Sequence, residues 1–319
     1  MPPLGLTLRK LLLGNEKRPG WAVVSVNNPE DHVQVTLEGI GAALDITSNH
    51  VIVELLPLLV AIGFQIDDLP KIQSAKLWMT FREAGKIIGR VKIAFEHAVA
   101  LPGCQLCIFR TVGGRDYSLP PVRMQVNQLY HRCRLFFDRN PRNKKMKMNE
   151  LFYVWVLYMR LRPVYLMSYC CEEGSNLYPM DLIGFIGQYY LLSIRKSDPG
   201  LSLVAKAGRM ALSSVPVSYR KLLNRLGSNH GKAIFDWSSI PVVQKSSSFY
   251  GIPIPHDAHH VMELKLVEQF ALDDHMVLVT SLAHQESFTS GTQICFTSRF
   301  FQQYLLRQGR PLEVHEEEK

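Results

Sequence analysis

Three segments in the middle of the chain are the most informative about its fold: Arg162-Pro163-Val164-Tyr165-Leu166-Met167-Ser168-Tyr169-Cys170, then Asn176-Leu177-Tyr178-Pro179-Met180-Asp181-Leu182-Ile183-Gly184, then Tyr190-Leu191-Leu192-Ser193-Ile194-Arg195-Lys196-Ser197. The first and third contain apolar, aromatic or β-branched runs of strand length that end in turn-forming or charged residues. The pattern therefore predicts strand, loop, strand. Because the third segment ends on two cations and a hydroxyl, its end is a suitable surface for a phosphate.

At these residues the chain resembles the flavin reductase-like, FMN-binding split-barrel family. The resemblance lies in the Pro-led strand, the loop that follows it, the strand into Arg195-Lys196-Ser197, the segment from Ala211 to Pro216, and the later Glu263 and Asp274-His275. It covers about residues 150 to 290, and the order of these short motifs carries it. It implies a mainly β fold with peripheral helices, in which the C-terminal half is an FMN-binding split β-barrel. Strand-length apolar runs before residue 118 separately predict that the N-terminal unit is β-rich.

The resemblance also implies an activity and a set of site residues. It implies a flavoprotein that passes hydride from NAD(P)H to a flavin, with FMN as the expected cofactor and FAD as the alternative. It places the catalytic role on His275, near the reacting rings, and it implies a homodimer with the flavin near the interface. The cofactor-binding residues that it implies are Asn176, Met180, Asp181, Leu182, Arg195, Lys196 and Ser197.

One departure from the family pattern bears on the cofactor. Family members commonly carry small hydroxyl residues in the loop after the asparagine, whereas this chain has Met180-Asp181-Leu182-Ile183. An ionised Asp181 cannot donate a hydrogen bond and repels a nearby phosphate. Either its carboxylate points elsewhere, toward Arg195 or a ribityl hydroxyl, or the flavin site is altered.

Composition sets bounds that do not depend on the resemblance. The chain has 319 residues, 47% of them apolar, which is ample for a buried core. Its start shows no leader pattern, so we expect its six cysteines to be reduced and the protein to be cytoplasmic. The longest apolar tract, Val51 to Phe64, is interrupted by Glu54 and Pro57 and is too short to span a bilayer, so no membrane association is expected.

The chain divides into segments of different composition. We expect a β-rich N-terminal unit at 1–118, a basic connector at 119–148, the split-barrel domain at 149–312 and an acidic tail at 313–319. Within the first unit, Thr80 and Glu83 have the spacing of a capping box, which predicts a helix from Phe81 to Ile88. A divergent second copy of the barrel is an alternative for this unit, although the two halves give no convincing alignment.

Other functions compete with a flavin reductase. A net charge of +8 favours anionic partners. The basic connector interleaves Arg and Lys with Tyr130, Phe136 and Phe137, a pattern that also occurs in proteins that bind nucleic acid. We expect the connector to be a solvated linker or a dimer surface instead. A flavin-binding protein without reductase activity is a further alternative. Cys104 and Cys107 have the spacing of half a zinc site, but buried cysteines are the expected reading. The histidines at 256, 259 and 260 fit no common metal site, so no metal is predicted.

Overall fold

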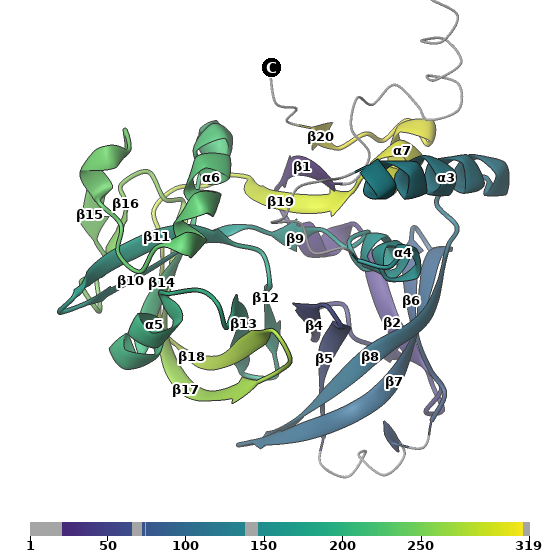
Figure 1. The fold of residues 1–319 in the computed structure, drawn as a ribbon, viewed down its shortest axis with the longest axis horizontal. Coiled ribbons are helices and arrows are strands. Elements are labelled where there is room, and N and C mark those ends of the chain that lie inside the picture. Colours follow the sequence, from purple (N-terminus) through teal and green to yellow (C-terminus); the bar gives the residue numbers. More distant parts are fainter. Residues whose placement is uncertain (1–20, 66–71, 74, 138–145, 315–319) are drawn as a thin grey trace, which may run out of the picture.

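A computed structural model of the chain describes residues 21–65, 72–73, 75–137 and 146–314. The described chain is mainly β, with two seven-stranded sheets, a four-stranded sheet, a two-stranded sheet and short helices around them (Figure 1). All the strand pairs are antiparallel. The predicted fold class, mainly β with peripheral helices, is confirmed.

The first seven-stranded sheet comes from the N-terminal part of the chain. Its spatial order is β3-β2-β6-β7-β8-β5-β4. These strands are β2 (Gln34–Glu38), β3 (Leu44–Asp45), β4 (His50–Leu55), β5 (Leu58–Phe64), β6 (Leu77–Glu83), β7 (Lys86–Leu101) and β8 (Cys104–Asp116). Apolar β-branched and aromatic residues dominate them, and every residue of β5 is buried.

The second seven-stranded sheet has the spatial order β11-β10-β14-β17-β18-β13-β12. It contains β10 (Tyr165–Cys171), β11 (Gly174–Met180), β12 (Ile183–Ile186), β13 (Tyr189–Arg195), β14 (Arg209–Ser214), β17 (His260–Ala271) and β18 (His275–Ser287). When the strands of each sheet are ranked along the chain, the two sheets have the same order. The first and second strands stand at one edge, the third and fourth at the other.

The remaining elements join and cover these sheets. The four-stranded sheet, of order β20-β1-β19-β9, pairs the first described strand with strands near the end of the chain. Its strands are β1 (Trp21–Val26), β9 (Arg162–Pro163), β19 (Gln293–Ser298) and β20 (Glu313–Val314), and the two-stranded sheet is β15 (Gln244–Ser246) with β16 (Pro253–Pro255). The α-helices are α3 (Pro121–Phe137), α4 (Met148–Leu157), α5 (Leu201–Ala207), α6 (Arg220–Leu226) and α7 (Arg299–Arg307). The 3-10 helices are η1 (Pro29–Asp31), η3 (Val217–Tyr219), η4 (Gly227–Gly231) and η5 (Trp237–Ser239).

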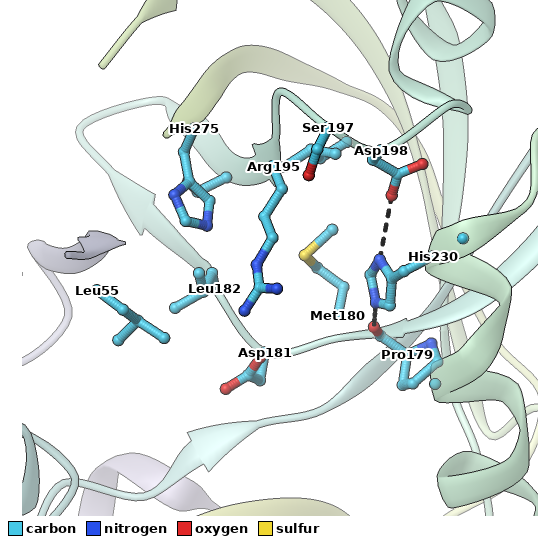
Figure 2. Close-up of a pocket in the computed structure, with 14 residues that line it drawn as sticks. Leu55, Pro179, Met180, Asp181, Leu182, Arg195, Ser197, Asp198, His230 and His275 are labelled. Atoms are coloured by element: carbon cyan, nitrogen blue, oxygen red, sulfur yellow. Dashed lines mark hydrogen bonds and ion pairs between the residues drawn. The ribbon is translucent and has the colours of Figure 1, made fainter. Parts of the chain in front are cut away.

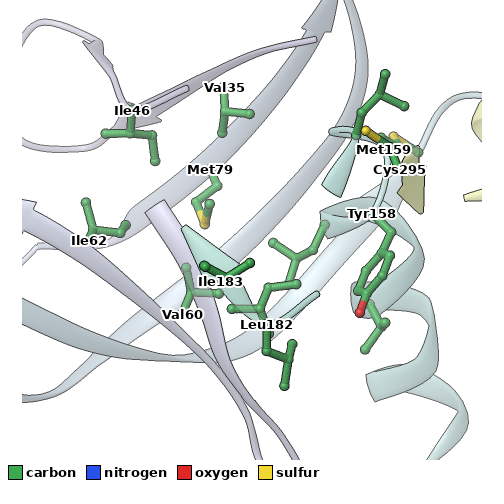
Figure 3. Close-up of a cluster of buried hydrophobic side chains, with 14 of the residues drawn as sticks. Val35, Ile46, Val60, Ile62, Met79, Tyr158, Met159, Leu182, Ile183 and Cys295 are labelled. Carbon is green, nitrogen blue, oxygen red and sulfur yellow. The ribbon is translucent and has the colours of Figure 1, made fainter. Parts of the chain in front are cut away.

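The core runs continuously between the two sheets. One buried cluster takes Val35, Val60 and Met79 from the first sheet and Leu182 and Ile183 from beside and within the second (Figure 3). Burial of this much shared apolar surface favours a fixed arrangement of the two sheets.

The helix predicted from Phe81 to Ile88 is wrong. Strands β6 and β7 form a hairpin there, with Glu83 opposite Lys86. Ala84 and Gly85 both have positive φ, +46° and +79°, as a two-residue hairpin turn of type I′ requires. Glu83 caps no helix: its carboxylate accepts from Tyr304 Oη at 3.2 Å and pairs with Arg310 at 2.7 Å.

The loop predicted between the strands at 164–169 and 190–194 is also largely wrong. Residues 176–180 lie in β11 and Ile183 begins β12, so only Asp181 and Leu182 stand between strands. Pro179 does not prevent pairing, because β11 is an edge strand and one side of its backbone needs no partner in the sheet. The basic connector contains helix α3, while residues 138–145 lie outside the described chain.

Candidate functional site

A pocket of about 470 Å³ opens where β13 ends. Its lining comes from the end of β11, the link to β12, the end of β13 and the turn after it, helix η4, the first residue of β18, and one residue of β4 (Figure 2). The lining residues are Leu55, Pro179, Met180, Asp181, Leu182, Ser193, Ile194, Arg195, Ser197, Asp198, Gly227, His230, Gly231 and His275. The volume lies within the range of small-molecule and cofactor sites.

Arg195 and His275 are brought together by strand pairing. Arg195 is the last residue of β13 and stands opposite His275, the first residue of β18. Figure 2 shows the Arg195 side chain extending across the pocket toward Asp181. Within the described chain the guanidinium has no hydrogen bond or ion pair. It therefore has its five N–H donors available to a ligand.

Asp198 and His230 form the opposite wall. Asp198 Oδ2 lies 3.2 Å from His230 Nδ1, and His230 Nε2 lies 3.0 Å from the carbonyl oxygen of Pro179 (Figure 2). The other Asp198 oxygen accepts from the backbone N–H of Gly200 at 2.8 Å. Both partners of the imidazole are acceptors, so a neutral ring donates to one of them and a protonated ring to both.

Asn176 is buried in β11 and does not line the pocket. Its amide nitrogen donates to the carbonyl oxygens of Lys232 at 2.7 Å and Asn229 at 3.4 Å. Asn229 in turn donates to the carbonyl oxygen of Leu177 at 2.9 Å. These bonds hold the segment that carries His230 against β11, so Asn176 shapes the pocket from behind.

Lys196 also lies outside the lining. Its ammonium donates to the carbonyl oxygens of Leu272 and Asp273, the latter at 3.0 Å, in the turn that precedes His275. The backbone N–H of Lys196 donates to the Asp274 carbonyl oxygen at 2.8 Å. Of the predicted phosphate ligands, Arg195 and Ser197 therefore face the pocket and Lys196 holds the neighbouring turn.

The Asp181 carboxylate is hydrogen-bonded to Tyr158. Tyr158 Oη donates to Asp181 Oδ2 at 3.0 Å, and burial together with the nearby carboxylate raises the pKa of that phenol. Arg162 donates to the backbone carbonyl oxygen of Asp181 at 2.7 Å and stacks over the Tyr158 ring. One oxygen of the Asp181 carboxylate is therefore directed to Tyr158, a partner that the sequence does not suggest.

His275 is buried, with 5% of its surface exposed. Its Nδ1 lies 3.5 Å from Oε1 of Glu54, a residue of β4 that is wholly buried. Glu54 also accepts from the backbone N–H groups of Asp273, at 3.0 Å, and Asp274. Strand β4 of the first sheet thus reaches the site in the second sheet.

Several residues that line or support the pocket cannot be identified from the sequence pattern. Asp198 and His230 lie 32 positions apart, and their meeting depends on the path of the chain through α5 and α6. Glu54 does carry a signal, because it is an ionisable residue inside the apolar run from Val51 to Leu56. Such a residue needs buried partners, which the pattern alone does not identify.

The other candidate constellations give no site among the described residues. Cys104 and Cys107 are buried and free, and burial raises the pKa of Cys107 to about 12, so it is a poor nucleophile. In the described ranges no cluster of His, Cys, Asp and Glu has a geometry that could hold a metal ion. No helix in the part of the chain that the structure covers is both long and apolar enough to cross a membrane.

Solved structures with similar folds include an FMN-binding protein from Thermus thermophilus, at 22% identity and a TM-score of 0.36 over 40% of this chain and 72% of the other. The styrene monooxygenase flavin reductase of Pseudomonas putida S12 has 15% identity and a TM-score of 0.36 over 43% and 88%. The NADH:FAD oxidoreductase of Streptomyces globisporus has 10% identity and a TM-score of 0.40 over 50% and 91%. No protein-family model and no curated relative matches the sequence.

The predicted resemblance to split-barrel flavin reductases is thus confirmed as a likeness of fold over 40% to 50% of this chain. At these identities and TM-scores the likeness concerns the fold alone. What those proteins bind is not transferred to this chain by the comparison.

Proposed function

We propose that the pocket beside Arg195 binds flavin mononucleotide and that the protein reduces this flavin with NAD(P)H. The observation that carries the proposal is the Arg195 guanidinium, which lies in a pocket of about 470 Å³ without a hydrogen bond or ion pair in the described chain, beside Ser197 and His275. An unpaired cation at the end of a pocket is suited to an anionic group of a ligand.

The phosphate end of the ligand is assigned to Arg195 and Ser197. The planar guanidinium can hold two phosphate oxygens at once and stays charged at any working pH, and the hydroxyl adds a donor. Two carboxylates also line the pocket, but Asp198 is bonded to His230 and Asp181 to Tyr158. These bonds to neighbours partly offset the repulsion that either carboxylate exerts on a phosphate.

The ring end is assigned to the apolar side of the pocket. Leu55, Met180, Leu182 and Ile194 offer surface against which a planar aromatic ring can pack, and a methionine sulfur makes favourable contacts with aromatic rings. A bound flavin supplies hydride chemistry at its ring system. His275 can orient the ring by donating a hydrogen bond, and the surrounding apolar side chains exclude water from it.

The nicotinamide cofactor and the cytoplasm complete the proposal. A nicotinamide dinucleotide also carries phosphates, and a net charge of +8 favours its approach. Five of the six cysteines are free in the described chain, a state that suits a reducing compartment. FAD remains the alternative flavin.

Burial of His275 favours a second candidate, a flavin-binding protein without reductase activity. Only 5% of the residue is exposed, so little of the imidazole is available to a nicotinamide. This protein would bind FMN through the same Arg195 and Ser197, and would fail to oxidise NADH or NADPH.

Titration with FMN and riboflavin, followed by quenching of flavin fluorescence, tests the proposal. FMN is expected to bind more tightly, and Arg195→Ala should weaken FMN by about 1.5 to 3 kcal/mol, the range for a hydrogen bond to a charged group, while riboflavin barely changes. Arg209→Ala is the matched control, because that exposed arginine stacks on Tyr250 outside the pocket. Equal affinities for the two flavins in the unmutated protein would refute the phosphate site.

A further inference from the structure

The two long hairpins of the chain share one unusual pattern. Strands β7 and β8 are joined by Pro102-Gly103, and β17 and β18 by Leu272-Asp273-Asp274. The backbone N–H of Leu272 donates to the His275 carbonyl oxygen at 2.8 Å, so the chain reverses at Asp273-Asp274 as it does at Pro102-Gly103. Each hairpin then shifts register twice, and the shifts fall at matching places. The matching shifts are those between Phe95 and His97 and between Leu266 and Glu268, and those between Lys92 and Ile93 and between Glu263 and Leu264.

Each residue pair of the β17–β18 hairpin corresponds to a residue pair of the β7–β8 hairpin, and the difference in residue number is the same for all of these pairs. Ile93 opposite Thr111, for example, corresponds to Leu264 opposite Leu282. Bulges are specific features that persist within families of related units. Together with the identical strand order of the two sheets, the matched bulges mark a repeated structural unit.

We infer that the chain contains two copies of one β-unit, paired with each other about an approximate two-fold axis, and that the N-terminal copy completes the pocket of the C-terminal copy through Glu54. The importance of Glu54 for flavin binding rests on the proposed function. The pairing of the two copies, and the hydrogen bonds of Glu54 to the turn, are independent of the proposed function.

Contacts between the copies are reciprocal, as a two-fold arrangement requires. Val51 and Gly184 occupy equivalent places in their sheets and touch each other: a Cβ built on Gly184 would lie 2.5 Å from Val51 Cγ2. Gly63 and Ser193 are also equivalent. Ser193 donates to the Val53 carbonyl oxygen, and a Cβ built on Gly63 would lie 2.5 Å from Ile186 Cγ2.

The hairpin of each copy meets the turn of the other. The β4–β5 hairpin reaches the turn Asp273-Asp274 through Glu54. The β12–β13 hairpin reaches the turn Pro102-Gly103, where Gln188 and Tyr189 each donate to the Pro102 carbonyl oxygen at 3.0 Å. One contact is made by a buried carboxylate and the other by an exposed amide and a phenol.

Among the described residues, the charged groups of a site stand only at the C-terminal one of these two equivalent places. Counted along the paired strands, Cys104 stands where His275 stands, and Gln65, the residue after β5, stands where Arg195 stands. A buried thiol and a neutral amide offer no counterpart to the arginine and histidine. One flavin per chain is therefore expected, bound by a monomer.

Glu54 is assigned as a positioning residue for His275. Its carboxylate accepts hydrogen bonds from two backbone N–H groups of the turn, and the Lys196 ammonium donates to two of the turn's carbonyl oxygens. Hydrogen bonds to ionised groups are stronger than those between neutral groups, so these two side chains fix the turn through both its N–H groups and its carbonyl oxygens. The residue after that turn is His275, whose place opposite Arg195 follows from the turn's position.

The variant Glu54→Gln tests this role, because its amide can accept only through one atom and presents a donor where a backbone N–H now points. We expect the amides of Asp273 and Asp274 to exchange hydrogen at least tenfold faster. FMN and riboflavin should both bind about tenfold more weakly, since the ring end and not the phosphate end is disturbed.

The matched control is Gln188→Ala, which removes a hydrogen bond of the reciprocal contact outside the pocket. It should leave the Asp273 and Asp274 amides and both flavin affinities unchanged. An equal loss of flavin affinity in both variants would overturn the positioning role, and so would unchanged amide exchange in Glu54→Gln. If the unmutated protein binds neither flavin, the proposed function fails, and the exchange comparison still decides the role of Glu54.

The unmutated protein provides a measurement that does not depend on a folded variant. Sedimentation of the full chain with FMN should give a monomer that carries one flavin. Two flavins per chain, or a site that forms only in a dimer of chains, would overturn the inference that the second copy within the chain supplies the partner surface.

Discussion

The two seven-stranded sheets share a strand order and differ in the chemistry at the end of one strand. In the first sheet, Pro102-Gly103-Cys104 forms an uncharged turn and strand start. In the second, Asp273-Asp274-His275 occupies the equivalent place, with Arg195 opposite and Glu54 behind. The backbone arrangement therefore provides two similar positions, and a few side chains give only the second of them the charges that the proposed function requires.

The comparison also shows how the sheets divide their roles. The first sheet contributes Leu55 to the lining of the pocket in the second, and its buried Glu54 carboxylate accepts hydrogen bonds from the turn that precedes His275. The second sheet contributes Gln188 and Tyr189, which donate hydrogen bonds to the backbone of the first sheet's turn at Pro102. Among the described residues, this contact creates no charged site comparable to the one beside Arg195. A unit that carries no motif of its own can thus contribute side chains to the pocket of its neighbour.

Gly184→Ala is expected to break the arrangement most strongly. Its new Cβ would lie 2.5 Å from Val51 Cγ2, at the contact between equivalent strands β4 and β12. Overpacking of this kind costs about 1 to 3 kcal/mol of unfolding free energy. Chemical denaturation measures the loss. Gly113→Ala is the control, because its Cβ would meet Lys92 Cβ at 3.5 Å, an ordinary contact; equal stability of the two variants would contradict the close approach of the sheets.

His275→Asn should separate an enzyme from a binding protein. If the imidazole assists hydride transfer, turnover of NAD(P)H-dependent flavin reduction should fall by about ten- to a hundredfold, a barrier increase of about 1.4 to 2.7 kcal/mol. FMN affinity should hold, unlike in Glu54→Gln, because the turn stays in place and asparagine keeps a donor of similar size there. Cys104→Ser changes the equivalent residue of the first sheet and should leave turnover intact. Unchanged turnover in His275→Asn, with flavin still bound, would give His275 a structural role only.

The sequence predicts the strands of this fold better than its connections. The sequence predicts β10 from Val164 to Tyr169 and β13 from Tyr190 to Ile194, because the apolar and aromatic residues of these runs suit a buried sheet. Thr80 and Glu83 mislead because their spacing also suits a helix start, whereas Ala84 and Gly85 adopt the left-handed conformation of a hairpin turn. Local spacing does not reveal the partner strand that decides between these outcomes.

Within the site, the sequence identifies the residues that end strands and misses those that meet through the fold. Arg195 and Ser197 stand out because charge and hydroxyl follow an apolar run. Glu54 bonds a turn more than two hundred positions away, at 3.0 Å from the Asp273 nitrogen. Asn176 looks like a ligand in its motif, yet its amide is directed to the backbone of Asn229 and Lys232. Its role in cofactor binding stays a prediction.

The two sheets also differ in a buried titratable group, because the first sheet buries His50 where the second has Ile183, and the stability of the protein should therefore depend on pH. Burial lowers the pKa of His50 from 6.5 to about 3, with the charges of Arg160 and Arg162 acting in the same direction; the bond of Nδ1 to the Ile46 carbonyl oxygen opposes the shift. As the pH falls below 6.5 the unfolded chain takes up a proton that the folded chain does not, so stability is lost progressively toward pH 3.

For His50 alone, that linkage amounts to about 1 kcal/mol between pH 6.5 and pH 5.5. His50→Ile should reduce the slope of unfolding free energy against pH by this amount in that window, even though it loses the bond to Ile46 and so starts from a lower value at neutral pH. Urea unfolding at a series of pH values measures the slope. An unaltered slope would mean that His50 is accessible to protons in the folded protein, and that the first sheet is less tightly closed around it than its burial indicates.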